Sequence, residues 1–91
     1  MVEFPRETVE YGFVTVKNGA AVITAGVELV VVPYVEAGVT PRPIDWKPAI
    51  VVEGKTAFIV RDLPPGRYAV WARFTAGTET PVRLVGEFRI T

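Results

Sequence analysis

The last third of the chain carries the feature that most constrains its fold, a strict alternation of side-chain character along two neighbouring stretches. One parity is occupied by Tyr68, Val70, Ala72 and Phe74 in the first stretch, and by Val82, Leu84, Gly86, Phe88 and Ile90 in the second. A period of two residues is typical of a strand with one face in a core. The segment 76–81 between them has the length of a hairpin connection. The pattern therefore predicts two antiparallel strands whose named residues point inward.

Five stretches upstream also have the composition of strands. They are residues 11–17, 20–24, 27–35, 46–52 and 56–60, in which Val, Ile, Thr and aromatic residues predominate. The pair Asn18-Gly19 predicts a type I′ hairpin between the first two. Gly12 predicts a β-bulge, because the apolar positions change parity after Tyr11 and Phe13.

Two turns lead into the later strands. Glu53-Gly54 predicts a tight turn, and Pro65-Gly66 suits a type II turn, because Pro presets φ and Gly accepts a positive φ. Tyr68 follows directly. A Tyr at this place in an immunoglobulin-like domain forms the tyrosine corner, with its ring in the core and its hydroxyl bonded to backbone just upstream. We therefore expect a structural role for Tyr68.

These elements together predict an all-β fold, an immunoglobulin-like β-sandwich of about seven antiparallel strands. We expect residues 8–91 to form this single domain and residues 1–7 to form an extended N-terminal arm. Residues 27–35 are apolar on both faces. The outer set Val30, Val32 and Tyr34 is therefore either a second exposed patch or a surface that residues 1–24 cover.

The residue inventory argues against catalysis. The 91 residues include no His, Cys or Ser, which supply the commonest general base, the usual nucleophiles and the usual transition-metal ligands. The acidic residues are scattered singly, and no Asp-x-Asp-x-Asp run is present for calcium. We therefore predict no enzymatic activity, no cofactor and no metal.

The charge balance limits the class of partner. Ten Lys and Arg residues match ten Asp and Glu residues, so the formal net charge is zero. This balance argues against broad electrostatic binding to nucleic acid or to an anionic membrane. No apolar run is long enough to cross a bilayer, and no secretory signal opens the chain, so we expect neither membrane insertion nor secretion.

Protein contacts are the remaining expectation, and Trp71 is their centre. Its parity places it outward among arginines, the composition of an interface hot spot; the alternative is a solvated cation–π patch. The candidate contact residues are Phe4 in the arm, Arg42 and Trp46 around the Pro-rich loop, and Arg67, Trp71, Arg73, Arg83 and Arg89 in the last two strands. Trp46 has a second interpretation, as a core residue that seals one end of the sandwich.

The segment 62–91 resembles the last two strands of immunoglobulin-like and fibronectin type III-like domains. More narrowly, it resembles small single-domain virion proteins of tailed phages that infect actinobacteria, which share Gly-x-Tyr-x-Val-x-x-Arg, then Pro-Val, then a final Gly-x-x-x-Ile/Val-Thr. The matching residues are Gly66, Tyr68, Val70, Arg73, Pro81, Val82, Gly86, Ile90 and Thr91. The match covers about a third of the chain.

The resemblance implies a non-enzymatic virion structural protein, either a capsid decoration or stabilising subunit or a subunit of the head–tail region. Its implied partners are major capsid or head–tail proteins and copies of itself, and its implied location is the virion after synthesis in the host cytoplasm. The alternative is a generic recognition module for a carbohydrate or a cell-surface protein. In that case Trp46 and Trp71 would be its stacking platforms.

Overall fold

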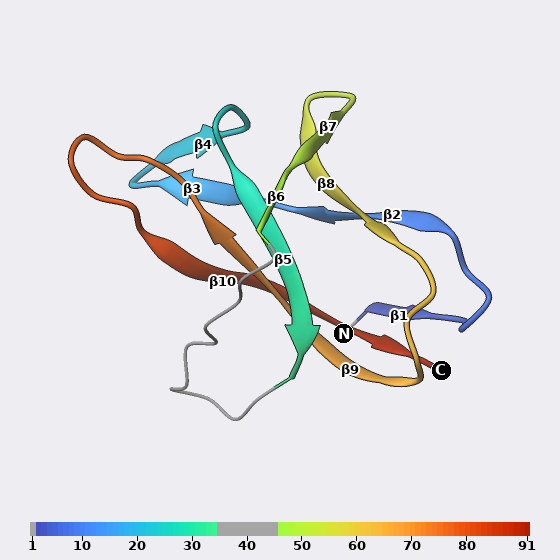
Figure 1. Ribbon diagram of the computed structural model, residues 1–91. Helices are drawn as coiled ribbons and strands as arrows, with labels where there is room; N and C mark the ends of the chain where they lie inside the picture. The colour runs from blue at the N-terminus through green and yellow to red at the C-terminus, as the bar shows by residue number, and fades with distance from the viewer. Residues whose placement is uncertain (1, 35–45) are drawn as a thin grey trace.

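The computed structural model describes residues 2–34 and 46–91, and this part of the chain is all β, with ten strands (Figure 1). The strands are β1 (Val2–Phe4), β2 (Glu10–Val14), β3 (Val16–Asn18), β4 (Ala21–Ile23), β5 (Glu28–Pro33), β6 (Lys47–Pro48), β7 (Ile50–Val52), β8 (Lys55–Val60), β9 (Gly66–Arg73) and β10 (Val82–Ile90). The all-β prediction is confirmed. The count of about seven antiparallel strands is not, since ten are described and one pair is parallel.

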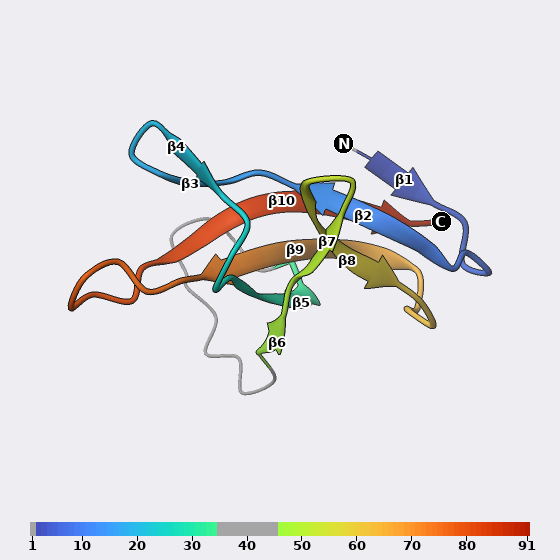
Figure 2. The same ribbon diagram turned by 90° about the horizontal axis from the view of Figure 1, so that it is seen from above.

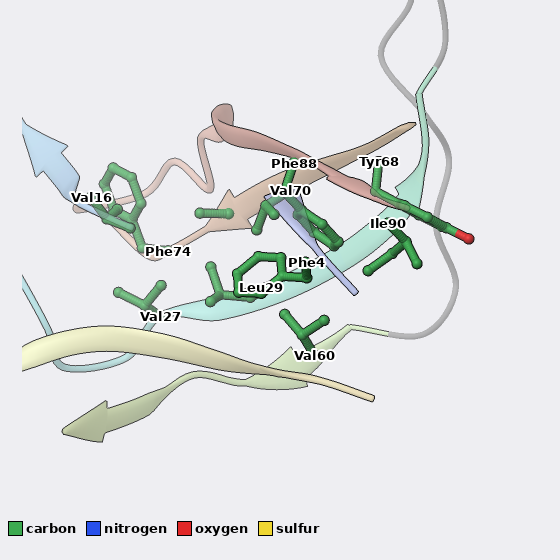
Figure 3. Close-up of a cluster of buried hydrophobic side chains, with 11 residues drawn as sticks. Phe4, Val16, Val27, Leu29, Val60, Tyr68, Val70, Phe74, Phe88 and Ile90 are labelled. Atoms are coloured by element: carbon green, nitrogen blue, oxygen red, sulfur yellow. The ribbon is translucent and has the colours of Figure 1, made fainter. Parts of the chain in front are cut away.

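The strands form two larger sheets and a hairpin. The five-stranded sheet has the order β1-β10-β9-β5-β6, the three-stranded sheet has the order β2-β8-β7, and β3 pairs with β4. Figures 1 and 2 show β2 and β8 lying across one side of the larger sheet. Val60 of β8 and Leu29 of β5 belong to one cluster of buried side chains (Figure 3), so the core lies between the two sheets.

The hairpin of β9 and β10 confirms the alternation at the end of the chain, with one correction. Tyr68, Val70 and Phe88 are buried as expected. The register shifts between Leu84 and Gly86, which is a β-bulge, and an extra residue reverses the parity of everything before it. Val82 and Leu84 are therefore exposed by 38% and 49%, and the prediction that they point inward is wrong.

Phe88 is the centre of the aromatic core. Its ring stacks on Tyr68 with centroids 5.4 Å apart and on Phe58 at 5.7 Å, and it meets Phe4 edge to face at 5.7 Å. These are the offset and T-shaped geometries that aromatic pairs prefer. Phe88 thus links β1, β8 and β9, which belong to both larger sheets. Figure 3 shows it together with Phe4 and Tyr68.

The tyrosine corner predicted at Tyr68 is present. The ring is buried, and the hydroxyl donates a 2.6 Å hydrogen bond to the carbonyl oxygen of Pro64. Gly66 takes φ 152°, a positive value as expected but far from the value near +80° of a type II turn. The turn before β9 is therefore closed by the Tyr68 bond, and Gly66 already begins the strand.

The expected N-terminal arm is a strand instead. β1 pairs in parallel with β10, and the amide of Thr91 donates to the carbonyl of Phe4 at 2.9 Å. Phe4 is only 8% exposed and belongs to the core cluster, so its assignment as a contact residue is wrong. An isolated sequence pattern of three residues does not reveal this pairing, because the partner strand lies at the opposite end of the chain.

Two expected strands are each divided where the chain changes partners. Residues 46–52 form β6, which pairs with β5, and β7, which pairs with β8. Between them the amide of Ala49 donates to the carbonyl of Val27 at 2.8 Å. Residues 11–17 form β2 in the three-stranded sheet and β3 in the hairpin. These two divisions and β1 account for the higher number of strands.

Gly12 makes close contact where a bulge was expected. The register of β2 and β8 runs without a shift from Glu10 to Val14. A Cβ on Gly12 would lie 2.3 Å from Cζ of Phe58, so the missing side chain makes room for that ring. The inward positions of this segment are Gly12, Val14 and Val16, in one unbroken period of two.

Of the two predicted tight turns, one has the expected position and the other is shifted by one residue. Glu53 and Gly54 both have positive φ, 51° and 77°, and close the predicted tight turn between β7 and β8. The hairpin at Asn18-Gly19 is present, but Asn18 is already paired with Ala21. The loop is thus residues 19–20, with positive φ at Gly19 alone, which fits a type II′ turn better than type I′.

Candidate functional site

The outer face of the five-stranded sheet contains four of the predicted contact residues. We call it the Trp71 face, and its members on β5, β9 and β10 are Glu28, Val30, Val32, Arg67, Ala69, Trp71, Arg73, Val82, Leu84, Glu87 and Arg89. Directly opposed residues of antiparallel strands point to the same side. Trp71 therefore lies between Val30 and Leu84, away from the core, as the sequence predicts.

Arg73 is fixed between an acidic and an aromatic side chain. Its Nε and one terminal nitrogen donate to the two carboxylate oxygens of Glu28 at 2.9 and 3.2 Å, a bidentate pair. Its guanidinium carbon lies 4.7 Å from the ring centroid of Trp46, within cation–π range. Trp46 is partly buried and lies outside the core cluster, so the core interpretation of Trp46 is wrong.

Arg67 repeats this arrangement at the other end of β9. A terminal nitrogen donates to Glu87 at 2.9 Å, and the guanidinium carbon lies 3.8 Å from the centroid of the Tyr34 ring. The hydrogen bond to Glu87 raises the pKa of Arg67 further above its ordinary value. The guanidinium is charged at any ordinary pH, as arginine side chains are, and it stacks on Tyr34 in that charged form.

The Trp71 face is buried at some of its members and exposed at others, among them Val82 and Leu84. Val30 and Ala69 are only 7% and 3% exposed although they point away from the core. The arginines stack on Trp46 and Tyr34 rather than on Trp71, which corrects the expected cation–π patch. Trp71 is partly buried, and its Nε1 is buried without an acceptor in the described part of the chain.

The remaining predicted contact residues are dispersed. Arg83 opposes Ala72, on the core side of the sheet at the far end of the hairpin, because the bulge reverses its parity. Arg89, by contrast, does lie on the Trp71 face, where it is exposed, opposite Arg67 and beside Glu3. Arg42 lies outside the described residues.

The outer face of the three-stranded sheet has the opposite character, and sequence reasoning missed it. We call it the Tyr11 face; its members on β2, β7 and β8 are Tyr11, Phe13, Ile50, Val52, Lys55, Ala57 and Ile59. Tyr11, Phe13 and Ile59 are exposed by 49%, 52% and 44%. Tyr11 and Phe13 lie with ring centroids 6.5 Å apart, and the Lys55 ammonium is 6.0 Å from the Phe13 ring. Two aromatic rings and an isoleucine thus meet solvent side by side.

The signal for this face was present at Gly12. The period of two through residues 12, 14 and 16 places Tyr11 and Phe13 outward, but Gly12 has no side chain to mark the first inward position. A Gly inside a strand indicates close approach as well as a bulge. Interpreting Gly12 as a site of close approach would have placed Tyr11 and Phe13 outward and so identified the face.

Residues 2–34 and 46–91 contain no group of three or more Asp and Glu side chains placed to hold a metal ion. Among the same residues no helix is long and apolar enough to cross a membrane. Comparison of the chain with protein-family models, with curated proteins and with solved structures found no match in any of the three.

Proposed function

We propose that this chain is a non-enzymatic virion structural protein of a tailed phage, a capsid decoration or stabilising subunit or a head–tail subunit that acts through protein–protein contacts. The Tyr11 face carries the contact part of this proposal. Exposed aromatic and aliphatic side chains that lie together mark interaction surfaces in small proteins. The virion part is supported by the resemblance of residues 62–91 to phage proteins of that kind.

We also propose that the fold is immunoglobulin-like. In that plan strands G, F and C share one sheet and B, E and D the other, with a tyrosine corner before F. The orders β10-β9-β5 and β2-β8-β7 agree with it, and so does the bond from Tyr68 to Pro64. β1 differs from the plan, since it pairs with β10 and leaves the free edge of β2 without a strand A.

The test is to add purified protein to virus particles that lack it. We expect saturable binding, and we expect the protein among the components of the complete virion by mass spectrometry. Ile59→Lys, which places a charge in the Tyr11 face, should reduce binding, whereas Leu84→Lys on the Trp71 face, at a residue also 49% exposed, should leave it unchanged. Absence from complete virions together with no binding would refute the virion role.

The carbohydrate-binding alternative has less support. Sugar recognition by stacking needs a bare aromatic ring, and Trp46 is stacked by Arg73 while Trp71 is partly buried. A glycan screen with Trp71→Ala as the control separates the two functions, because only the alternative predicts binding that this variant loses while its circular dichroism spectrum remains that of the folded chain.

A further inference from the structure

The free edge of β2 is the least protected edge of the two larger sheets. Natural edge strands are kept short, or carry Pro, Lys or a bulge, which prevents pairing with other chains. β6 consists of only Lys47 and Pro48, and β1 and β7 have three residues each. β2 has five residues, no Pro, no Lys and no register shift, and among the described residues it pairs only with β8.

Apolar surface lies on both sides of this edge. On the outside are the exposed rings of Tyr11 and Phe13. On the inside is a small apolar hollow between the edges of β1 and β2, lined by Val2, Phe4, Gly12, Val14 and Phe58 among others. A strand added to β2 would cover the hollow and extend the aromatic stripe, so the edge combines free backbone groups with apolar contacts.

We propose that β2 pairs antiparallel with β2 of a second copy of this chain, in a register centred on Gly12. Antiparallel pairing matches positions of the same parity, and only this register pairs all five residues of β2. Tyr11 then stands opposite Phe13 of the second copy, and Phe13 opposite its Tyr11. Two aromatic cross-strand pairs of this kind stabilise a sheet. The product is a continuous six-stranded sheet with a doubled Tyr11 face.

Charge favours this edge-to-edge pairing over face-to-face stacking. Glu10 is the only charged residue of β2, and it stands opposite Val14 of the second copy. The two Glu10 residues are then roughly 14 Å apart along the strands, beyond the screening length of about 8 Å at physiological salt. Stacking two Tyr11 faces would instead bring Lys55, a member of this face, under the second copy, and burying an unpaired ammonium is unfavourable.

The size of the contact makes the dimer weak. A five-residue edge with two half-exposed rings buries on the order of 400 Å² per copy. A stable interface buries about 800 Å² per partner. We therefore expect monomers and dimers in concentration-dependent exchange, with the dimer dominant where many copies are held close together. This inference is independent of the proposed virion role.

The experiment is sedimentation analysis of the full chain over a wide concentration range, with backbone NMR spectra recorded on dilution. We expect a monomer–dimer equilibrium, with dilution shifts confined to residues 9–15 and their neighbours on β8. Phe13→Lys should raise the dissociation constant by about tenfold or more, because it removes both aromatic pairs and adds edge charges. Ile59→Lys is the matched control: it lies on the same face at similar exposure but on the inner strand β8, and it should change the constant by less than about threefold.

A second variant distinguishes weaker dimerisation from a loss of folding. Phe13→Thr keeps strand propensity, and it should also weaken the dimer while its melting curve stays cooperative. A chain that is monomeric at roughly millimolar concentration, where even weak pairs associate, would overturn the proposal. So would equal weakening by Ile59→Lys, which indicates stacking of faces, or dilution shifts centred on β5 and β9. None of these results would bear on whether the protein binds virus particles.

Discussion

The two outer faces of this small domain both contain aromatic side chains next to cations. These side chains are covered on one face and exposed to solvent on the other. On the Trp71 face, Arg73 and Arg67 reach across β5 and β10, stack on aromatic rings and are held by Glu28 and Glu87. On the Tyr11 face a single cation, Lys55, lies 6.0 Å from a ring, and two aromatic side chains stay about half exposed. Carboxylates on the neighbouring strands thus hold both long arginine side chains over aromatic rings.

This difference also determines how much apolar area each face could still bury against a partner. A surface whose aromatic residues are already covered within the chain gains little from a partner, because the apolar area has left water before binding. A bare surface retains that driving force. Trp71 in an arginine-rich strand is therefore a weaker indicator of an interface than the sequence suggested, and Tyr11 and Phe13 are a stronger one.

The largest expected effect comes from replacing an aromatic side chain by alanine on each of the two faces. Trp71→Ala should lower the free energy of unfolding by about 3 kcal/mol, because a large, partly buried side chain leaves a gap. Phe13→Ala should lower it by less than about 1 kcal/mol, because a half-exposed ring loses little burial. Urea denaturation measures both. Equal losses would mean that the two faces do not differ in coverage.

The next test concerns the glycine beneath each face. Gly12→Ala should cost about 2 kcal/mol, since the added Cβ would lie 2.3 Å from the Phe58 ring, which must move. Gly86→Ala is the matched control beneath the Trp71 face. Its Cβ would lie 3.3 Å from Cγ1 of Val14, a contact that small shifts relieve. In thermal melts, the melting temperature of Gly12→Ala should be clearly lower than that of Gly86→Ala. The reverse order would show that the contact of Gly86 with Val14 is the tighter of the two.

A strand, turn or bulge of this fold could be predicted from the sequence only where a particular side chain indicates which way the chain faces or turns. The β9–β10 hairpin and the Tyr68 corner were predictable, because an inward aromatic and a Pro-Gly turn mark them directly. The bulge in β10 was not, because Val82, Leu84 and Val85 are all apolar and no polar residue marks the change of face. Neither was the pairing of β1 with β10, since three residues do not identify a partner at the other end of the chain.

A smaller effect is expected from the unpaired indole nitrogen. Trp71→Phe removes a buried donor that has no acceptor among the described residues and keeps most of the ring. An unsatisfied buried donor is unfavourable, so we expect this variant to equal the parent or exceed it by up to about 1 kcal/mol in unfolding free energy. Tyr11→Phe, on the bare face, should have no effect. A clear loss in Trp71→Phe would indicate that Nε1 finds an acceptor in solution.

The smallest effect separates the two ion pairs that cover the Trp71 face. Glu28→Gln removes the negative charge from a bidentate ion pair, and Glu87→Gln removes it from an ion pair with a single hydrogen bond. All four side chains are 30% to 40% exposed, so solvent screens both pairs, and each loss should be about 0.5 kcal/mol or less. Because two parallel bonds hold the guanidinium over Trp46 more rigidly than one holds Arg67 over Tyr34, Glu28→Gln should cost more than Glu87→Gln at low salt. At high salt the two variants should converge on the parent, and Trp46 fluorescence should report any release of Arg73. A larger, salt-independent loss in either variant would mean that the carboxylate maintains packing rather than charge, and that the covering of this face depends on shape alone.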